Sequence, residues 1–260
     1  MFYRSLAISF VWCVFPSTIS SANDRNLLAE TDVASDGALL IVPVESNGHL
    51  RNYWVDTGVS NTIVPLETVK SWKPIRMENG RGIVQSEKIS VFERPDAEEF
   101  LGQMLRRRVE LYSMDLREIS EATGVNIEGV LGMGDLKRFV IQIDFDEGKF
   151  RLLRSASEAN GEIFPLGTER GCPTIKVVAG KTTFDAVVDT GASGDLFLTS
   201  QLFDLMVEKN EIKRGTDTEV VATLGGASKI PRGTLRNIGS TRLLRSGDIV
   251  AHPASVNFVW

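Results

Sequence analysis

The sequence contains only two cysteines and two histidines among 260 residues. So little cysteine excludes a disulfide-rich scaffold, and His49 and His252 do not have the spacing of a zinc site. The same two histidines leave little material for a serine–histidine–aspartate triad, and there is no Gly-x-Ser-x-Gly segment. No apolar run approaches the roughly twenty residues of a membrane-spanning helix. These absences disfavour metal-dependent and serine-dependent catalysis and an integral helical membrane protein.

Positive charge is also scarce. Lysine and arginine number 29 against 34 aspartates and glutamates, which gives a net charge of −5. Nucleic acid or an anionic membrane is therefore not the expected partner. The remaining composition, 42% hydrophobic and 24% charged, is that of an ordinary globular protein with enough length for one large domain or two lobes.

The first 22 residues have the pattern of a signal peptide. A positive charge precedes a mostly apolar stretch over 6–15, and small residues follow, ending in Ser20-Ser21-Ala22. We predict that 1–22 is removed on export to a secreted or periplasmic location, after which the chain is not stably inserted in a membrane. Cys172 is then the one remaining cysteine, and we expect it to be a small buried hydrophobe. The alternative is an N-terminal strand or anchor.

Short alternating or apolar runs bounded by turn residues make up the mature chain, which is typical of an all-β protein. The pattern predicts strands over 39–44, 50–55, 139–145, 149–153, 175–178 and 183–188. Helical periodicity is weak and is confined to 115–123 and 200–208. The segment 155–171 contains several glycines and a proline and is the natural linker between two halves.

One tripeptide occurs twice, in Asp56-Thr57-Gly58-Val59-Ser60 and Asp189-Thr190-Gly191-Ala192-Ser193. A single Asp-Thr-Gly arises by chance in roughly one chain in twenty of this length, and a matched pair is much rarer. Both copies follow a strand, a turn and a second apolar strand, and the two aspartates lie 133 residues apart. This repetition predicts an internal duplication, with one lobe over 23–157 and the other over 158–260.

The residue types of the repeated turn suit a pair of cooperating carboxylates. If Asp56 and Asp189 meet, they share one proton, so that one acts as general base on water while the other polarises a carbonyl group. The candidate supporting residues are the two threonines, which can bond across the pair, the two glycines, which allow a sharp turn, and the following serines. These residues are Thr57, Gly58, Ser60, Thr190, Gly191 and Ser193. Such chemistry needs no metal and no cofactor.

The chain resembles the aspartic proteases over most of 39–198. Residues 56–65 (Asp-Thr-Gly-Val-Ser-Asn-Thr-Ile-Val-Pro) are similar to the first active-site segment of pepsin-like members, and 129–134 resembles the apolar-apolar-Gly segment that closes their catalytic loop. Residues 189–193 look closer to the retroviral type of the superfamily. The resemblance implies two related β-barrel-like lobes with a cleft between them. It also implies endopeptidase activity on peptide or protein substrates, with Asp56 and Asp189 as catalytic residues.

Three departures from that pattern are visible. Val59 and Ala192 stand where pepsin-like members often have a hydroxyl, which predicts a less acidic pH optimum. The candidate flap, Asn79-Gly80-Arg81-Gly82, has no tyrosine. The second lobe has no clear counterpart of 129–134, and 223–226 fits better as a second flap-like hairpin, so we expect this lobe to be incomplete.

Two alternatives stay open at this point. The chain could be a protease-derived binding or interaction module that has lost turnover. It could also be an unrelated secreted β-domain, in which case Asp56 and Asp189 lie far apart. A homodimer built around Asp56 alone is conceivable, but two motifs in one chain make it unnecessary, and the oligomeric state stays open.

Overall fold

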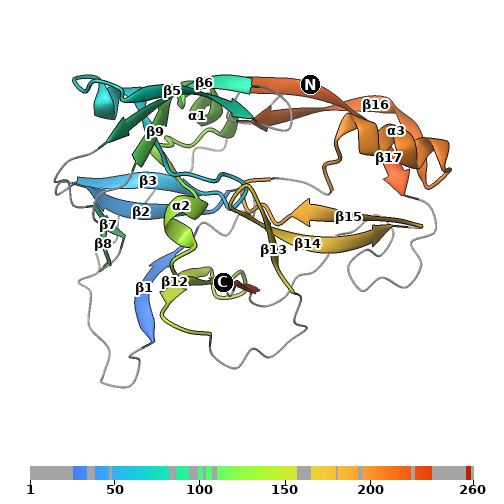
Figure 1. Ribbon diagram of the computed structural model, residues 1–260. Helices are drawn as coiled ribbons and strands as arrows, with labels where there is room; N and C mark the ends of the chain where they lie inside the picture. Colours follow the sequence, from blue (N-terminus) through green and yellow to red (C-terminus); the bar gives the residue numbers. More distant parts are fainter. Residues whose placement is uncertain are drawn as a thin grey trace, which may run out of the picture.

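The computed structural model describes residues 26–33, 39–46, 49–81, 86–93, 99–101, 104–106, 110–156, 165–179, 181–192, 196–223, 226–235 and 256–258. Within these ranges the chain is mostly β-sheet with a few short helices (Figure 1), as the all-β prediction requires. The predicted signal peptide lies outside the described residues and stays a prediction.

A nine-stranded sheet forms the centre of the first half. Its spatial order is β5 (Arg76–Arg81), β6 (Ser86–Glu93), β9 (Glu110–Met114), β4 (Ile63–Pro65), β10 (Gly129–Leu131), β3 (His49–Val55), β2 (Ile41–Ser46), β7 (Glu99–Leu101) and β8 (Met104–Arg106). Strand β10 pairs in parallel with β3 and antiparallel with β4, so it lies between the strands before and after the first Asp-Thr-Gly turn.

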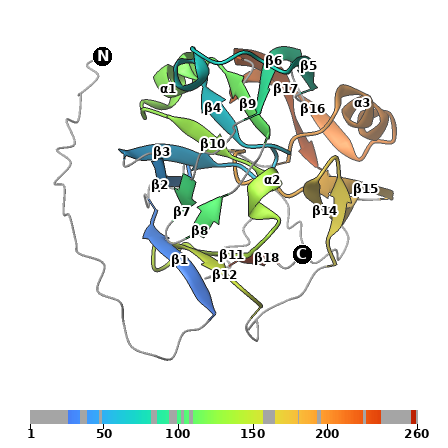
Figure 2. The ribbon, with the colours of Figure 1, turned by 60° about the vertical axis from the view of Figure 1, so that its left-hand side comes forward.

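Three smaller sheets complete the described part of the chain. The first has the order β1 (Leu27–Asp32), β12 (Lys149–Leu153), β11 (Val140–Asp144) and β18 (Val256–Phe258). The second consists of β13 (Gly167–Glu169), β14 (Cys172–Ala179) and β15 (Thr182–Val187), and the third is the hairpin of β16 (Ile212–Thr223) and β17 (Gly226–Leu235). The second-half elements β14 and β15 lie away from β1, β2 and β3 (Figure 2).

The helices are short. They are the 3-10 helix η1 (Leu66–Val69), α1 (Arg117–Thr123), α2 (Met133–Leu136) and α3 (Ser200–Glu208). Helix α1 ends at Gly124, whose φ of 72° and N–H bond to the Ser120 carbonyl form a left-handed C-cap. Thr199 caps α3 by accepting a bond from the Leu202 N–H. No helix in the described ranges has the length and apolar character needed to cross a bilayer.

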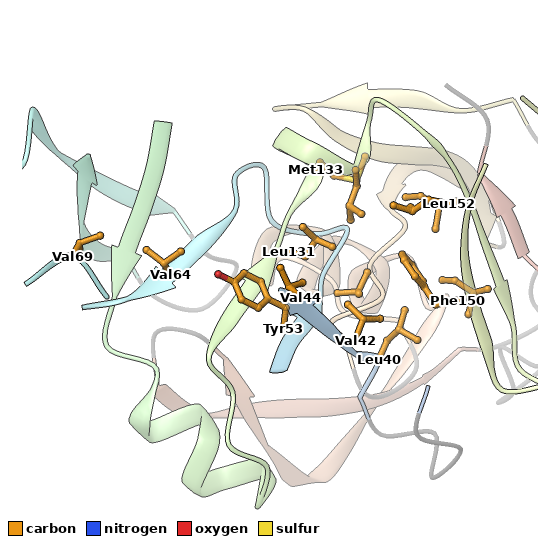
Figure 3. Close-up of a cluster of buried hydrophobic side chains, with 14 of the residues drawn as sticks. Leu40, Val42, Val44, Tyr53, Val64, Val69, Leu131, Met133, Phe150 and Leu152 are labelled. Carbon is orange, nitrogen blue, oxygen red and sulfur yellow. The ribbon is translucent and has the colours of Figure 1, made fainter. Parts of the chain in front are cut away.

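The main core lies between the nine-stranded sheet and the β11–β12 hairpin (Figure 3). Val42 and Leu131 from the large sheet lie in one buried cluster with Phe150 and Leu152 of β12, and the ring of Tyr53 points the other way, toward Val64. The end of strand β3 is buried on both faces, because Trp54, which follows Tyr53, belongs to a second core with Ile63, Val130 and Ile119 of α1. This two-sided burial explains why the sequence before Asp56 is continuously apolar.

The second half has a smaller core of its own. The apolar face of α3, with Phe203 and Met206, packs on Val177 of β14 and Ile212 of β16. The helices predicted over 115–123 and 200–208 are therefore confirmed as α1 and α3, within two residues. The expected linker is partly wrong, because Gly167–Glu169 forms strand β13 and pairs with β14. Within the described ranges every sheet is open, so barrel-like lobes stay a prediction.

Candidate active site

The two Asp-Thr-Gly turns follow equivalent strands. The Val55 N–H at the end of β3 donates to the Leu40 carbonyl at 2.8 Å, and the Val188 N–H after β15 donates to the Pro173 carbonyl at 2.8 Å. Leu40 and Pro173 lie as far apart in the sequence as the two aspartates. The structure therefore repeats the same local arrangement in both halves, as the predicted duplication requires.

The two turns are joined by the exchange of threonine hydroxyls. The Thr57 N–H donates to the Thr190 hydroxyl at 3.1 Å, and the Thr190 N–H donates to the Thr57 hydroxyl at 3.0 Å. Each hydroxyl then donates across the junction, that of Thr57 to the Val188 carbonyl at 2.6 Å and that of Thr190 to the Val55 carbonyl at 2.9 Å. Four hydrogen bonds thus fix one turn against the other.

The junction brings Asp56 and Asp189 together. The Gly58 N–H donates to Asp56 Oδ1 and the Gly191 N–H to Asp189 Oδ1, both at 2.8 Å. A Cβ on Gly58 would lie 2.4 Å from Asp189 Oδ2, and one on Gly191 would lie 2.5 Å from the Asp56 carboxyl carbon. Each carboxylate therefore packs on the glycine of the other turn, where no side chain fits. This geometry removes the alternative in which the two aspartates lie far apart.

The surroundings of the two carboxyl groups differ. Asp56 is buried, whereas Asp189 is half-buried. Burial raises the pKa of Asp56 well above its usual value, and the negative charge of Asp189 and a hydrogen bond with it raise this pKa further. Bonds from the Gly58 and Val59 N–H groups act in the opposite direction. The Asp56 carboxyl is thus suited to keep a proton.

Strand β10 and the start of α2 hold the first turn from behind. The Asp56 N–H donates to the Leu131 carbonyl at 3.1 Å, and the Met133 N–H donates to the Val59 carbonyl at 2.8 Å. Gly132 allows this approach, because a Cβ there would lie 2.4 Å from the Asn61 carbonyl oxygen. In the second half, β15 has no neighbour on its outer edge among the residues that the structure describes.

Cys172 contacts the first turn from the second half. Its thiol donates to the Gly58 carbonyl at 3.3 Å, and the adjoining Gly171 lies near Ser60. Burial, together with the charges of Asp56 and Asp189, raises the pKa of this thiol to about 11. The sequence predicted a small buried hydrophobe, and the structure adds a hydrogen bond between the halves that spacing along the chain could not show.

The other predicted site residues lie outside the junction. Ser60 accepts a bond from the Asn61 side chain at 3.3 Å, and Ser193 lies outside the described residues. The candidate flap lies in the hairpin of β5 and β6. Asn79, Gly80 and Arg81 are strand residues of β5, Arg81 pairs with Ser86, and Gly82 lies outside the described residues.

The second flap-like hairpin is also present. Strands β16 and β17 pair through Thr223 and Gly226, which confirms the hairpin predicted at 223–226. Strand β16 contacts α1, so this hairpin reaches the first half of the chain. Among the described residues no three histidine, cysteine or acidic side chains are grouped to hold a metal ion.

Two residues near the site escaped the sequence analysis. Thr62 and Asp135 are both buried, and the Thr62 hydroxyl donates to Asp135 Oδ2. The available signal was an acidic residue directly after the apolar-apolar-Gly segment, at a position whose neighbours Met133 and Leu136 are buried.

No family model matches the sequence, and no curated protein matches it. Among solved structures, the chain is similar to a retropepsin-like aspartic protease from Rickettsia conorii at 16% identity, covering 50% of this chain and 94% of that chain with a TM-score of 0.34. It is also similar to the retroviral protease-like domain of Ddi1 from Leishmania major at 16% identity, covering 39% of this chain and 78% of that chain with a TM-score of 0.27.

Proposed function

We propose that the chain is an aspartic-type endopeptidase, which hydrolyses peptide bonds with a water molecule activated by Asp56 and Asp189. One observation carries the proposal. The two carboxyl groups share a hydrogen bond, and each packs on the glycine of the other turn. Two carboxyl groups this close hold one proton between them, so that an acid and a base stand side by side. Aspartic proteases work in this way.

The reaction follows from that shared proton. The ionised carboxylate takes a proton from water as the water oxygen attacks the carbonyl carbon of the peptide bond. The protonated carboxyl group donates its proton to the carbonyl oxygen, which gives a tetrahedral diol. The C–N bond then breaks as the nitrogen takes the proton that the first carboxylate received from water, while the second carboxylate takes a proton from one diol hydroxyl. A carboxylic acid and an amine are released, and the carboxyl pair again holds one proton. Burial makes Asp56 the better place for the proton in the free enzyme.

The surrounding turn residues keep the acid and the base aligned. The Gly58 and Gly191 N–H groups each fix one carboxylate oxygen at 2.8 Å. The crossed threonine bonds fix the separation of the two turns. Val59 and Ala192 supply no hydroxyl to the carboxylates, so no side chain at these positions stabilises the ionised form. We therefore propose a less acidic pH optimum than a hydroxyl at these positions would give.

The test is peptide cleavage by the full chain beside Asp56→Asn and Asp189→Asn. Each protein is incubated with a diverse peptide mixture from about pH 3 to about pH 7, and the products are identified by mass spectrometry. Asp185→Asn is the matched control, because Asp185 is an exposed aspartate of β15 that pairs with Lys176 at 3.1 Å. We expect cleavage by the wild type and the control, and none by the two active-site variants.

Two outcomes would contradict the proposal. Cleavage that persists in either active-site variant would show that the carboxyl pair is not the catalyst. A folded wild type that cleaves nothing across this pH range would exclude the enzyme and favour the binding-module alternative.

A further inference from the structure

Thr62 and Asp135 form a buried polar pair behind the first Asp-Thr-Gly turn. Thr62 is 1% exposed and Asp135 is 6% exposed. Thr62 ends the loop that begins with Asp56, and Asp135 lies on α2, which follows β10. The Thr62 hydroxyl donates to Asp135 Oδ2 and accepts from the Gly132 N–H at 3.2 Å. One hydroxyl therefore connects the catalytic loop to both the glycine and the acid of the segment behind it.

The contacts around this pair leave the loop little room. The Asp56 N–H and the Val59 carbonyl each form a hydrogen bond to the segment 131–135. In addition, a Cβ on Gly132 or Gly134 would lie 2.4 Å or 3.3 Å from a carbonyl oxygen of the loop. Backbone packed this closely shifts as a unit when one bond is lost. The position of the Asp56 carboxyl group thus depends on how the segment 131–135 is held.

A carboxylate at this place has a physical reason. Burying an acid is costly unless it accepts hydrogen bonds, so Asp135 fixes the direction of the Thr62 hydroxyl proton. The hydroxyl oxygen is then free to accept from Gly132. Valine in place of Thr62 has a similar shape, but it would leave the Gly132 N–H unpaired and remove a donor from Asp135. The loop could regain partners only by moving.

The second half contains a chemically matched pair in a different place. The buried Thr182 hydroxyl donates to the buried Glu211 at 2.6 Å. Thr182 begins β15, whereas Asp189 follows the end of that strand, so the two are separated by roughly 20 Å of extended chain. This pair holds the β14–β15 turn and does not touch the active-site junction.

We propose that Thr62 and Asp135 are positioning residues for Asp56, an inference that rests on the proposed endopeptidase function. They set the rate of the chemical step by holding the Asp56 turn against Asp189. The Thr182–Glu211 pair stabilises the fold and has no such effect. Hydrogen bonds of the same kind thus differ in their effect on catalysis because they differ in place.

The first experiment compares Thr62→Val with Thr182→Val in peptide cleavage by the full chain. Rates are corrected for the folded fraction, measured by circular dichroism at the assay temperature. We expect Thr62→Val to lower kcat by about tenfold to a hundredfold with little change in KM, since small misplacements of catalytic groups have effects of this size. Thr182→Val should lower the thermal midpoint and leave kcat near the wild-type value. Thr62→Ser, which keeps the hydroxyl, should restore kcat.

Asp135→Asn is measured in parallel, because it keeps the volume of the side chain and removes its charge. We expect a smaller fall in kcat than in Thr62→Val. Equal corrected kcat values for Thr62→Val and Thr182→Val would overturn the inference. If Thr62→Val does not fold, a wild-type kcat in Asp135→Asn would overturn it.

A second readout separates this inference from the proposed function. If the folded wild type cleaves no peptide, the function fails, and positioning is then measured by carbon-13 NMR titration of the Asp56 carboxyl group. The titratable groups facing it are Asp189 and the Cys172 thiol, beside the N–H groups of Gly58 and Val59. We expect Thr62→Val or Asp135→Asn to move its pKa toward the ordinary value, because a displaced turn is more hydrated. Thr182→Val should not move it, and an unmoved pKa in both Thr62→Val and Asp135→Asn would overturn the inference.

Discussion

The same tripeptide occupies two different environments in the two halves of this chain. The first turn is buried and held by β10 and α2, whereas Asp189 in the second turn is half-buried and follows a strand with an open outer edge among the described residues. The crossed threonine bonds are shared equally between the turns. The first turn is therefore held by its own half of the chain, and contacts with this first turn help to position the second.

This asymmetry has a chemical result. Two carboxyl groups in identical surroundings would have no preferred owner of the shared proton. Here burial favours the neutral form of Asp56 before any substrate is present. A duplicated motif can thus give two aspartates of unequal pKa, because the residues packed around each turn differ between the halves while the tripeptide is the same.

The strongest test of the comparison adds a methyl group to each turn. Gly58→Ala and Gly191→Ala place a Cβ 2.4 Å and 2.5 Å from atoms of the opposite carboxyl group. Both variants should lose at least about a hundredfold in kcat/KM, because the two carboxyl groups must separate. Gly191→Ala should also lower the urea midpoint more, since it pushes against the firmly held Asp56.

Gly215→Ala on β16 is the control, because a Cβ there meets nothing nearer than 3.2 Å. It should keep its activity. A fully active Gly58→Ala or Gly191→Ala variant would show that the carboxyl groups do not rest on these glycines.

A smaller effect is expected from the crossed threonines. Thr57→Val and Thr190→Val each leave an N–H group and a carbonyl of the other turn without a partner, at a cost of about 1–3 kcal/mol. The fall in the free energy of unfolding should be larger for Thr57→Val than for Thr190→Val. Thr57 is 1% exposed, whereas Thr190 is half-buried, so that water can replace its lost bonds. Urea unfolding measures both, with the serine variants as controls. Equal losses would mean that both turns are equally shielded from water.

The smallest effects are opposite pH dependences of stability. The pKa of Asp56 is raised above 3.8 on folding. The protonated Asp56 carboxyl group therefore contributes to the free energy of unfolding fully below pH 3.8, and this contribution is lost as the pH rises through the folded pKa. Asp56→Asn should therefore make the protein more stable at neutral pH than the wild type.

Glu211 behaves in the opposite way. Bonds from the Thr182 hydroxyl, and then from the Lys181 N–H, lower its pKa below 4.5, so its contribution is present above that value and is lost as the pH falls through the folded pKa. Glu211→Gln should be less stable than the wild type at neutral pH, and this difference in the free energy of unfolding should become smaller in acid. Urea midpoints between about pH 3 and about pH 7 measure both variants, and shifts of the same sign would contradict the assignment.

Local signals predicted much of this fold. The alternation in 149–153 corresponds to β12, and the apolar face of 200–208 corresponds to α3, because each element has a strong period of its own. The Asp-Thr-Gly turns and their matching strands were readable for the same reason. Strand β13 within the expected linker was not predicted, because a strand of three residues has too short a pattern to detect.

The remaining features of the site depend on contacts between distant residues. The Thr62–Asp135 bond joins residues 73 apart, and the Cys172–Gly58 bond joins residues 114 apart. No local pattern marks either pair, because threonine, aspartate and cysteine are common in buried positions for unrelated reasons.

The bond from Cys172 to the Gly58 carbonyl makes the junction between the halves measurable by chemistry. With its pKa raised to about 11, the thiol is almost entirely protonated at neutral pH and is a poor nucleophile while the halves are closed. Alkylation of this residue must wait for an opening that exposes it to water and restores an ordinary pKa. In a chain whose Cys13 has been replaced by serine, the alkylation rate of Cys172 therefore measures how often the two halves separate.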